Sequence, residues 1–232
     1  NMTTVDVYSD KGQATAVLAK LYKQCFETYN SPLCGADPIM RHDKNTGGQQ
    51  AKFSEEMTGW KGSYYDGSVQ KPPYWNAPRS DTKNYNNFDK KTLYPTVYVI
   101  NNFIQEIERS RSLIADNVFW DRLKGQAIFM RAWLFFDAAR EWGGFPYYCT
   151  DIDMPDMDTK SLRMPMQECI DKVCEDFKLA ASLLPAKWDN ENYGRFTSVA
   201  ALAMSARARI FMASPIFNAN WDNPDSQRWQ QA

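Results

Sequence analysis

The sequence has little of what catalytic and metal sites are made from. Of its 232 residues, one is a histidine, His42, which stands in a polar stretch. No Ser-His or Cys-His nucleophile pair can be assembled around a core position, and neither an H-E-x-x-H motif nor a glycine-rich phosphate loop is present. The five cysteines are odd in number and contain no C-x-x-C pair. We therefore expect neither a disulfide framework nor a zinc site, and interpret most of them as small buried apolar residues.

Excess charge of one sign and long apolar runs are also lacking. The 27 Lys and Arg residues balance 28 Asp and Glu residues, which gives a net charge of -1. Nucleic-acid-binding proteins normally carry a basic patch, so no nucleic-acid partner is expected. No stretch approaches the ~20 apolar residues of a membrane span. Residues 1–4 are not a signal peptide, since they lack a charged region followed by an apolar one.

Paired acids are the remaining catalytic candidates, because a glycosidase needs only two carboxylates at the right separation. Such pairs are common among 28 acids in 232 residues, so we do not expect an enzyme. Residues 151–158 could offer oxygen atoms to calcium, but their spacing does not follow an EF-hand loop, so no cofactor is supported by a motif. The pairs of acids considered as candidates for catalysis are Glu55/Glu56, Asp151/Asp153 and Asp156/Asp158.

The pattern of apolar residues predicts helices and no strand. Helices are expected over residues 9–29, from 93 onward, from an N-cap at Asp116 to about 142, over 165–184, from an N-cap at Thr197 to 212, and from about 224. Residues 127–139 are apolar nearly all round, so neighbouring helices must cover them. The fold class is therefore all-α, a helical array resembling tetratricopeptide (TPR) repeats with long irregular loops, although the 34-residue consensus is not obeyed.

Arg131 lies inside this apolar helix and needs a carboxylate or carbonyl partner, because an unpaired buried charge is very costly. We expect it to hold the structure together, in an ion pair or as a cap on a neighbouring loop, in preference to binding a ligand. The same expectation applies to Arg195 and Arg209.

Residues 58–88 form the most aromatic irregular segment, in which glycines and prolines prevent a long helix. Its rings alternate with Asn, Asp and Arg, as a sugar-binding surface requires: rings cover the C–H faces of pyranoses and polar groups bond their hydroxyls. The same rings could instead pin the loop onto the helices, and the residues leave both interpretations open. The candidate ligand-binding residues are Trp60, Tyr74, Trp75, Asn76, Arg79 and Tyr85.

Several blocks of the sequence, taken in order, match the motifs of one protein family. Residues 125–146, GQAIFMRAWLFFDAAREWGGFP, resemble E-A-x-F-x-R-A-x-x-Y-F-x-L-x-x-x-Y-G-x-V-P, without its first acid and with Phe-Pro in place of Val-Pro. Residues 170–185 are similar to I-x-x-D-L-x-x-A-x-x-x-L-P, 194–201 to G-R-x-T-x-x-A-A, and 209–213 to R-V-Y-L-Y-A. Residues 98–102 fit a Y-x-x-I-x-x-A-N helix, with Asn for Ala. With these blocks in this order, the chain resembles the SusD/RagB family of outer-membrane nutrient-binding lipoproteins of Bacteroidetes.

The resemblance implies that residues 1–232 are the N-terminal portion of a single SusD-like domain, truncated before its C-terminal half. It implies a protein on the extracellular face of the outer membrane, held by a lipid anchor absent from this chain. Such proteins capture glycan and deliver it to a SusC-like TonB-dependent porin without chemistry. In relatives, aromatic residues before the Y-x-x-I-x-x-A-N helix contribute to the glycan site, which corresponds here to residues 74–87. The alternatives are a peptide-binding RagB-type member and a helical scaffold that binds only proteins.

Overall fold

The computed structural model describes residues 7–28, 93–148, 163–220, 222–223 and 226–232. Proximity of Cα atoms divides the chain into two compact units, one of residues 1–21 with 97–232 and one of residues 22–96. The described residues of the second unit are the end of one helix and the beginning of the next. The contacts discussed below therefore lie within the first unit.

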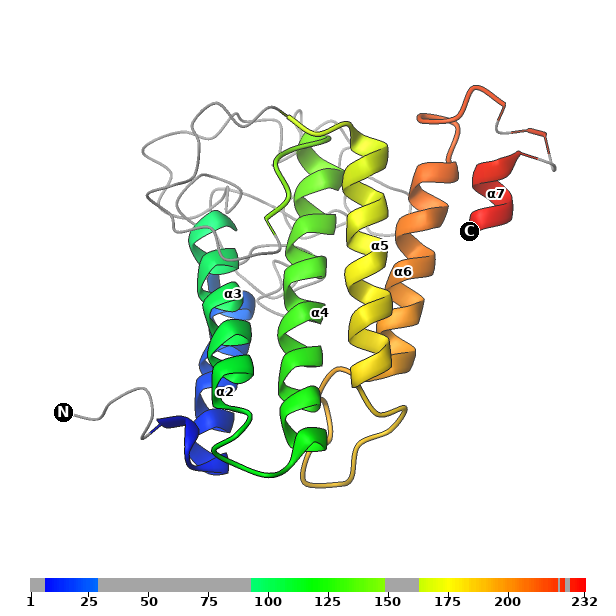
Figure 1. The fold of residues 1–232 in the computed structure, drawn as a ribbon. Coiled ribbons are helices and arrows are strands. Elements are labelled where there is room, and N and C mark those ends of the chain that lie inside the picture. The colour runs from blue at the N-terminus through cyan, green and yellow to red at the C-terminus, as the bar shows by residue number, and fades with distance from the viewer. Residues whose placement is uncertain (1–6, 29–92, 149–162, 221, 224–225) are drawn as a thin grey trace, which may run out of the picture. The chain divides into compact units, whose positions relative to one another are not determined.

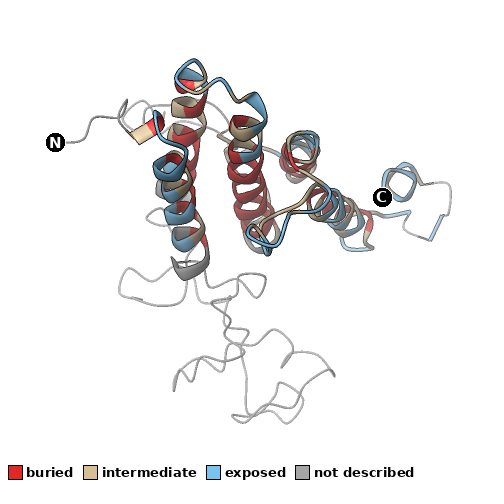
Figure 2. Cartoon of the chain, turned by 90° about the horizontal axis from the view of Figure 1, so that it is seen from below, coloured by how far each residue is buried: buried red, intermediate tan, exposed pale blue. Residues whose placement is uncertain are grey.

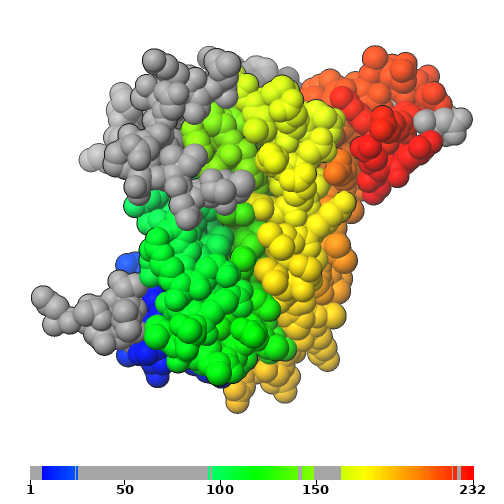
Figure 3. Space-filling view, in the orientation of Figure 1, coloured from blue at the N-terminus to red at the C-terminus, as the bar shows by residue number. Residues whose placement is uncertain are grey.

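All regular structure among the described residues is helical, which confirms the predicted fold class. Helices α4, α5 and α6 lie side by side in chain order, and each packs against the next (Figure 1). In the space-filling view, the α5 surface lies between those of the α3–α4 residues and α6 (Figure 3). The helices are α2 (Lys11–Thr28), α3 (Leu93–Ser110), α4 (Asn117–Trp142), α5 (Met166–Leu183), α6 (Ser198–Ala213) and α7 (Gln227–Gln231).

Helix ends are set by local chemistry, as the sequence predicts. The Asp116 carboxylate accepts a hydrogen bond from the backbone N–H of Phe119 at 2.9 Å, which caps α4. The Thr197 hydroxyl accepts one from the N–H of Ala200 at 3.1 Å and caps α6 in the same way. Gly143 ends α4 with φ +79°, a left-handed conformation that glycine adopts without a steric penalty.

The middle of α4 is the core of the described structure. Residues 127–139 are all buried, so the prediction that neighbours cover this part of the helix on most sides is confirmed (Figure 2). α5 contributes an apolar face against it, made of Cys169, Ile170, Val173, Cys174, Phe177 and Ala180. Cys25, Cys169 and Cys174 are free and buried, which confirms the interpretation of these three as small apolar residues. None of the described helices is long and apolar enough to cross a membrane.

The chain after α4 returns across the core in an extended conformation. Gly144 is required there, because a Cβ atom at this position would collide with the carbonyl oxygen of Met164. The Arg163 side chain donates to the Gly144 carbonyl oxygen at 2.6 Å, which holds the two passing segments together. Phe145 then stacks on Phe135 of α4, with ring centroids 5.3 Å apart. Residues 143–148 are thus packed onto α4 and α5.

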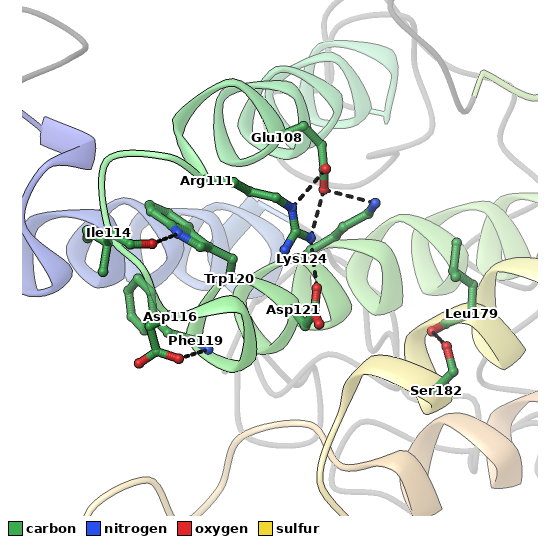
Figure 4. A network of polar contacts seen from close by, with 10 residues as sticks. All are labelled: Glu108, Arg111, Ile114, Asp116, Phe119, Trp120, Asp121, Lys124, Leu179 and Ser182. Atoms are coloured by element: carbon green, nitrogen blue, oxygen red, sulfur yellow. Dashed lines mark hydrogen bonds and ion pairs between the residues drawn. The ribbon is translucent and has the colours of Figure 1, made fainter.

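Four charged side chains join α3 to the first turns of α4 (Figure 4). The Arg111 guanidinium contacts the carboxylates of Glu108 at 2.9 Å and Asp121 at 2.7 Å. Lys124 of α4 reaches the Glu108 carboxylate at 3.0 Å. Each charge has an opposite neighbour, so this network fixes the α3–α4 connection.

One side of α6 is apolar and exposed. Val199, Leu202 and Ile210 are 60%, 53% and 52% exposed, and they follow one another at helical spacing. The opposite side of α6 carries Ala201 and Ala208, which are fully buried where the helix meets α5. We refer to Val199, Leu202 and Ile210 as the apolar side of α6.

Candidate functional site

The predicted ligand residues all lie outside the described residues, so the glycan site of residues 58–88 stays a prediction. The same holds for His42 and the three acid pairs. Within the described residues, no group of three or more His, Cys, Asp or Glu side chains is placed to hold a metal ion. The predicted ligand-binding residues that lie outside the described part of the chain are Trp60, Tyr74, Trp75, Asn76, Arg79 and Tyr85.

Arg131 is the centre of a buried polar cluster. It is 4% exposed, and its Nε and Nη2 atoms donate to the two carboxylate oxygens of Asp176 on α5, both at 2.8 Å. Its Nη1 atom donates to the side-chain oxygen of Asn101 on α3, also at 2.8 Å. This fork-shaped pairing is the strong form of an arginine–carboxylate contact. The prediction that Arg131 acts through a structural ion pair is confirmed.

The same cluster holds the segment that follows α4. The Tyr147 hydroxyl donates to Asp176 Oδ2 at 2.7 Å, and the Asn101 side-chain amide donates to the Tyr148 carbonyl oxygen at 3.3 Å. Three helices and this segment therefore share one polar centre. The cluster fixes Tyr147 and Tyr148, the last described residues before residue 149, and so positions the chain at that point.

The other two arginines behave differently from each other. Arg209 on α6 contacts the Asp171 carboxylate of α5 at 2.6 Å, which confirms the structural ion pair predicted for it. Arg195 does not follow the prediction: within the described part of the chain its guanidinium takes part in no ion pair or hydrogen bond. Its loop is closed by backbone bonds instead, including one from Arg195 N–H to the Asn192 carbonyl oxygen at 3.3 Å. The Arg195 side chain lines a surface groove.

This groove, which we call the α2–α4 groove, has a volume of about 590 Å³. Three separate segments line it: the start of α2, the start of α4, and the loop between α5 and α6. All three lie at the lower end of the first unit in Figure 1. A volume of this size is within the usual range of small-molecule sites. Its polar and aromatic lining includes Lys11, Asp116, Phe119, Arg122, Trp188, Glu191, Asn192 and Arg195.

Two aromatic rings in the groove each have a cation nearby. Lys11 Nζ lies 5.3 Å from the centre of the Phe119 ring, and it also contacts the Asp116 carboxylate at 2.6 Å. The Arg122 guanidinium lies 5.4 Å from the Trp188 ring, a cation–π distance. The Lys11 ammonium and then the backbone N–H of Phe119 hold the pKa of Asp116 below its ordinary value, so this carboxylate stays ionised. This groove was not predicted from the sequence, because its lining comes from segments that lie far apart in the chain.

A family model described as "Starch-binding associating with outer membrane", of the SusD-like type, matches residues 6–210. Among curated proteins, no significant match to the sequence is found. The solved structures similar to the chain include a SusD-like protein from Bacteroides fragilis NCTC 9343, with 21% identity and a TM-score of 0.57 over 90% of this chain and 36% of that one.

Two further structures show the same fold at lower identity. A SusD homolog from Bacteroides thetaiotaomicron VPI-5482 has 14% identity and a TM-score of 0.66 over 94% of this chain and 39% of that one. A laminarin-binding SusD-like protein has 13% identity and a TM-score of 0.55 over 90% of this chain and 42% of that one. The chain thus spans less than half the length of each of these three structures. Since the family model matches most of its residues, the chain belongs to the SusD-like family of starch-binding proteins associated with the outer membrane.

Proposed function

We propose that this chain is part of a cell-surface protein that captures oligosaccharides and delivers them to a SusC-like TonB-dependent transporter. The family match over residues 6–210 carries the proposal, since its description joins starch binding to the outer membrane. A similar structure is described as laminarin-binding, so proteins of this fold take more than one polysaccharide. A lipid anchor on the extracellular face of the outer membrane belongs to the same proposal.

Capture would be non-covalent. Residues 58–88 supply rings and amides of the kind that pyranoses need, with Trp75, Asn76 and Tyr85 as the leading candidates. The segment stands in the chain between α2 and α3, two helices whose described parts are regular. Rings in this segment would cover sugar C–H faces, and the neighbouring amides would bond hydroxyls.

Affinity gel electrophoresis with starch, laminarin and other polysaccharides tests this function. The wild-type protein should be retarded by at least one of them, and Trp75→Ala should weaken that binding by about tenfold, or 1.4 kcal/mol. Trp229→Ala is a matched control, because Trp229 is an accessible tryptophan of α7, outside residues 58–88. Binding to mixed peptides and to no polysaccharide would show the peptide-binding type instead.

Two further measurements separate this function from its alternatives. Incubation with the bound polysaccharide should leave its length unchanged, and shortened products would show an enzyme. Expression with a SusC-like transporter should give a complex that copurifies. If Trp75→Ala changed only that complex and left glycan uptake intact, the protein would be a scaffold for other proteins.

A further inference from the structure

The α2–α4 groove contains two guanidinium groups that form no close ion pair among the described residues, although Arg122 interacts at longer range with Asp116 and Asp189. Arg122 and Arg195 both line it, and within the described residues neither forms an ion pair. Other arginines of the same unit are paired: Arg111 with Glu108 and Asp121, Arg131 with Asp176, and Arg209 with Asp171. Arginine presents a planar fork of N–H groups that matches a carboxylate or a phosphate. The groove therefore has donors suited to an anionic ligand.

The charge balance of the groove limits how much negative charge the group bound by the two arginines can carry. Lys11 and Asp116 contact each other at 2.6 Å, which leaves Arg122 and Arg195 against Glu191 within the lining. Asp189, which accepts a hydrogen bond from the lining residue Asn192, is a further carboxylate that interacts with the charge of Arg122. The groove is therefore close to electrically neutral, and Glu191 and Asp189 would repel a group with two negative charges more strongly than a group with one. A carboxylate fits this balance better than a phosphate does.

The remaining lining suits a sugar ring. The Trp188 indole N–H donates to the Phe196 carbonyl oxygen at 2.7 Å, so the ring is held in place and its polar atom is already satisfied. What this half-buried ring offers to a ligand is the part of its apolar surface that the Arg122 guanidinium, 5.4 Å from the ring centre, does not cover, and pyranose C–H groups pack on such a surface. The Asn192 side-chain amide donates to Asp189 at 2.8 Å, which leaves its oxygen as an acceptor beside the ring. Glu191 adds a second acceptor for hydroxyl groups.

We propose that the α2–α4 groove binds a carboxylated pyranose, such as a uronic acid residue of an acidic polysaccharide. The sugar carboxylate is bound by Arg122 and Arg195, its ring packs on Trp188, and its hydroxyls bond to Asn192 and Glu191. This inference rests on the proposed glycan-binding function and adds a second set of binding residues, none of which belongs to residues 58–88. A peptide carboxylate would bring the same charge, but not the pyranose C–H face and hydroxyls that Trp188, Asn192 and Glu191 would contact.

Isothermal titration calorimetry with α-1,4-linked trigalacturonate and with its carboxyl-reduced counterpart tests the proposal. The acidic trimer should bind at least about tenfold more tightly than the reduced one, because only the acidic trimer can form charge-assisted bonds to the two arginines. Its affinity should fall as salt is added, since the groove is open to solvent. Acidic peptides of the same charge serve as a competing ligand class.

Variants then assign the binding to the groove. Arg195→Gln should weaken trigalacturonate binding about tenfold or more, while Arg207→Gln, an exposed arginine of α6 outside the groove, should leave it unchanged. Arg195→Lys should restore only part of the affinity, because lysine keeps the charge and loses the fork. Trp75→Ala should bind trigalacturonate as the wild type does. Urea unfolding curves show whether each variant is folded.

The results separate failure of the groove from failure of the proposed function. Three results would overturn the groove proposal. The acidic and reduced trimers could bind with equal affinity, Arg195→Gln and Arg207→Gln could have equal effects, or acidic peptides could bind more tightly than trigalacturonate. If neutral polysaccharides bind and trigalacturonate does not, the proposed function stands and the groove proposal is overturned. If no glycan of either kind binds, both are overturned.

Discussion

Replacing Asp176 with asparagine should strongly destabilise the protein. The change removes the carboxylate that faces Arg131 in the interior, where that arginine is 4% exposed and donates two bonds to it at 2.8 Å. The guanidinium would stay buried with its charge uncompensated, and the Tyr147 hydroxyl would lose a charged acceptor. Removing one partner of a buried ion pair costs about 3–5 kcal/mol. We expect Asp176→Asn to lower the free energy of unfolding by that amount, measured by urea denaturation followed by circular dichroism.

Asp171→Asn is the matched control. Asp171 lies five residues earlier on the same helix and also pairs with an arginine of a neighbouring helix, Arg209, at 2.6 Å. The two side chains are 40% and 19% exposed, so solvent screens this pair. Its loss should cost less than about 1 kcal/mol. The contrast between two chemically identical substitutions isolates the effect of burial.

A double variant tests the cause of the loss. In Arg131→Met with Asp176→Leu, both charges are replaced by apolar groups, so no uncompensated charge remains in the interior. Much of the stability lost in Asp176→Asn should return, because the cost of burying charge is removed together with the attraction between the charges. If Asp176→Asn proved no more harmful than Asp171→Asn, the polar cluster would not be what holds α3, α4 and α5 together.

Gly144→Ala should cost about 1–3 kcal/mol in urea denaturation, because the added Cβ collides with the carbonyl oxygen of Met164. Thr197→Ala should cost about 1 kcal/mol and speed amide hydrogen exchange in the first turn of α6, because the cap is lost. The pKa of Glu108 lies below its ordinary 4.5, chiefly because Arg111 donates to it, so its contribution to stability is present above that pH and lost as the pH falls. Glu108→Gln should therefore lose less stability than the wild type on acidification. Burial raises the pKa of the Cys25 thiol to about 12, so iodoacetamide should modify it slowly in the native protein, as mass spectrometry can show.

Each of these predictions has its own control. Gly194→Ala places alanine at a positive φ, +91°, in open space, so it measures backbone strain without a collision, whereas Gly144 has no positive φ and its replacement by alanine measures the collision alone. Thr197→Ser keeps the capping hydroxyl and should retain stability. Glu106→Gln removes an acid whose contact is with the largely exposed Arg109, and it should leave the acid dependence unchanged. Rapid modification of Cys25 in the native state would contradict its burial.

Features that depend on a few neighbouring residues were predictable from the sequence. The carboxylate of Asp116 and the hydroxyl of Thr197 cap N–H groups three residues ahead, so their roles can be inferred without tertiary structure. The same is true of the stop at Gly143, where the backbone needs a positive φ. The burial of residues 127–139 followed from composition, since an apolar helix surface has to be covered.

Partners that lie far along the chain were not predictable. The cost of burying the Arg131 charge showed that this arginine needs a partner, but any of 28 acids could have provided it. The partner is Asp176, 45 residues later, and its position depends on how α5 packs against α4. The contacts of Asn101 and Tyr147 with this pair also arise only when the helices and the segment after α4 meet.

The α2–α4 groove was missed for a related reason. Its lining comes from three segments that are separated in sequence, and none has an unusual composition by itself. Arg195 was expected, like Arg131, in an ion pair or as a cap on a neighbouring loop, yet its loop is closed by backbone bonds and the residue lines the groove. The one local signal was Trp188 beside Asp189, Asn190, Glu191 and Asn192, a smaller version of the aromatic and polar mixture that identified residues 58–88.

Because the apolar side of α6 is exposed, the stability of the folded chain depends on the concentration of any partner that covers this side. Val199, Leu202 and Ile210 are exposed in the folded chain, so any apolar surface that covers them in their helical arrangement binds the folded state in preference to the unfolded one. By linkage, a partner that binds only the folded state raises the free energy of unfolding. The gain is about 1.4 kcal/mol for each factor of ten by which the partner's concentration exceeds its dissociation constant. The melting temperature of this chain is therefore expected to rise with the concentration of any partner that covers this side of α6.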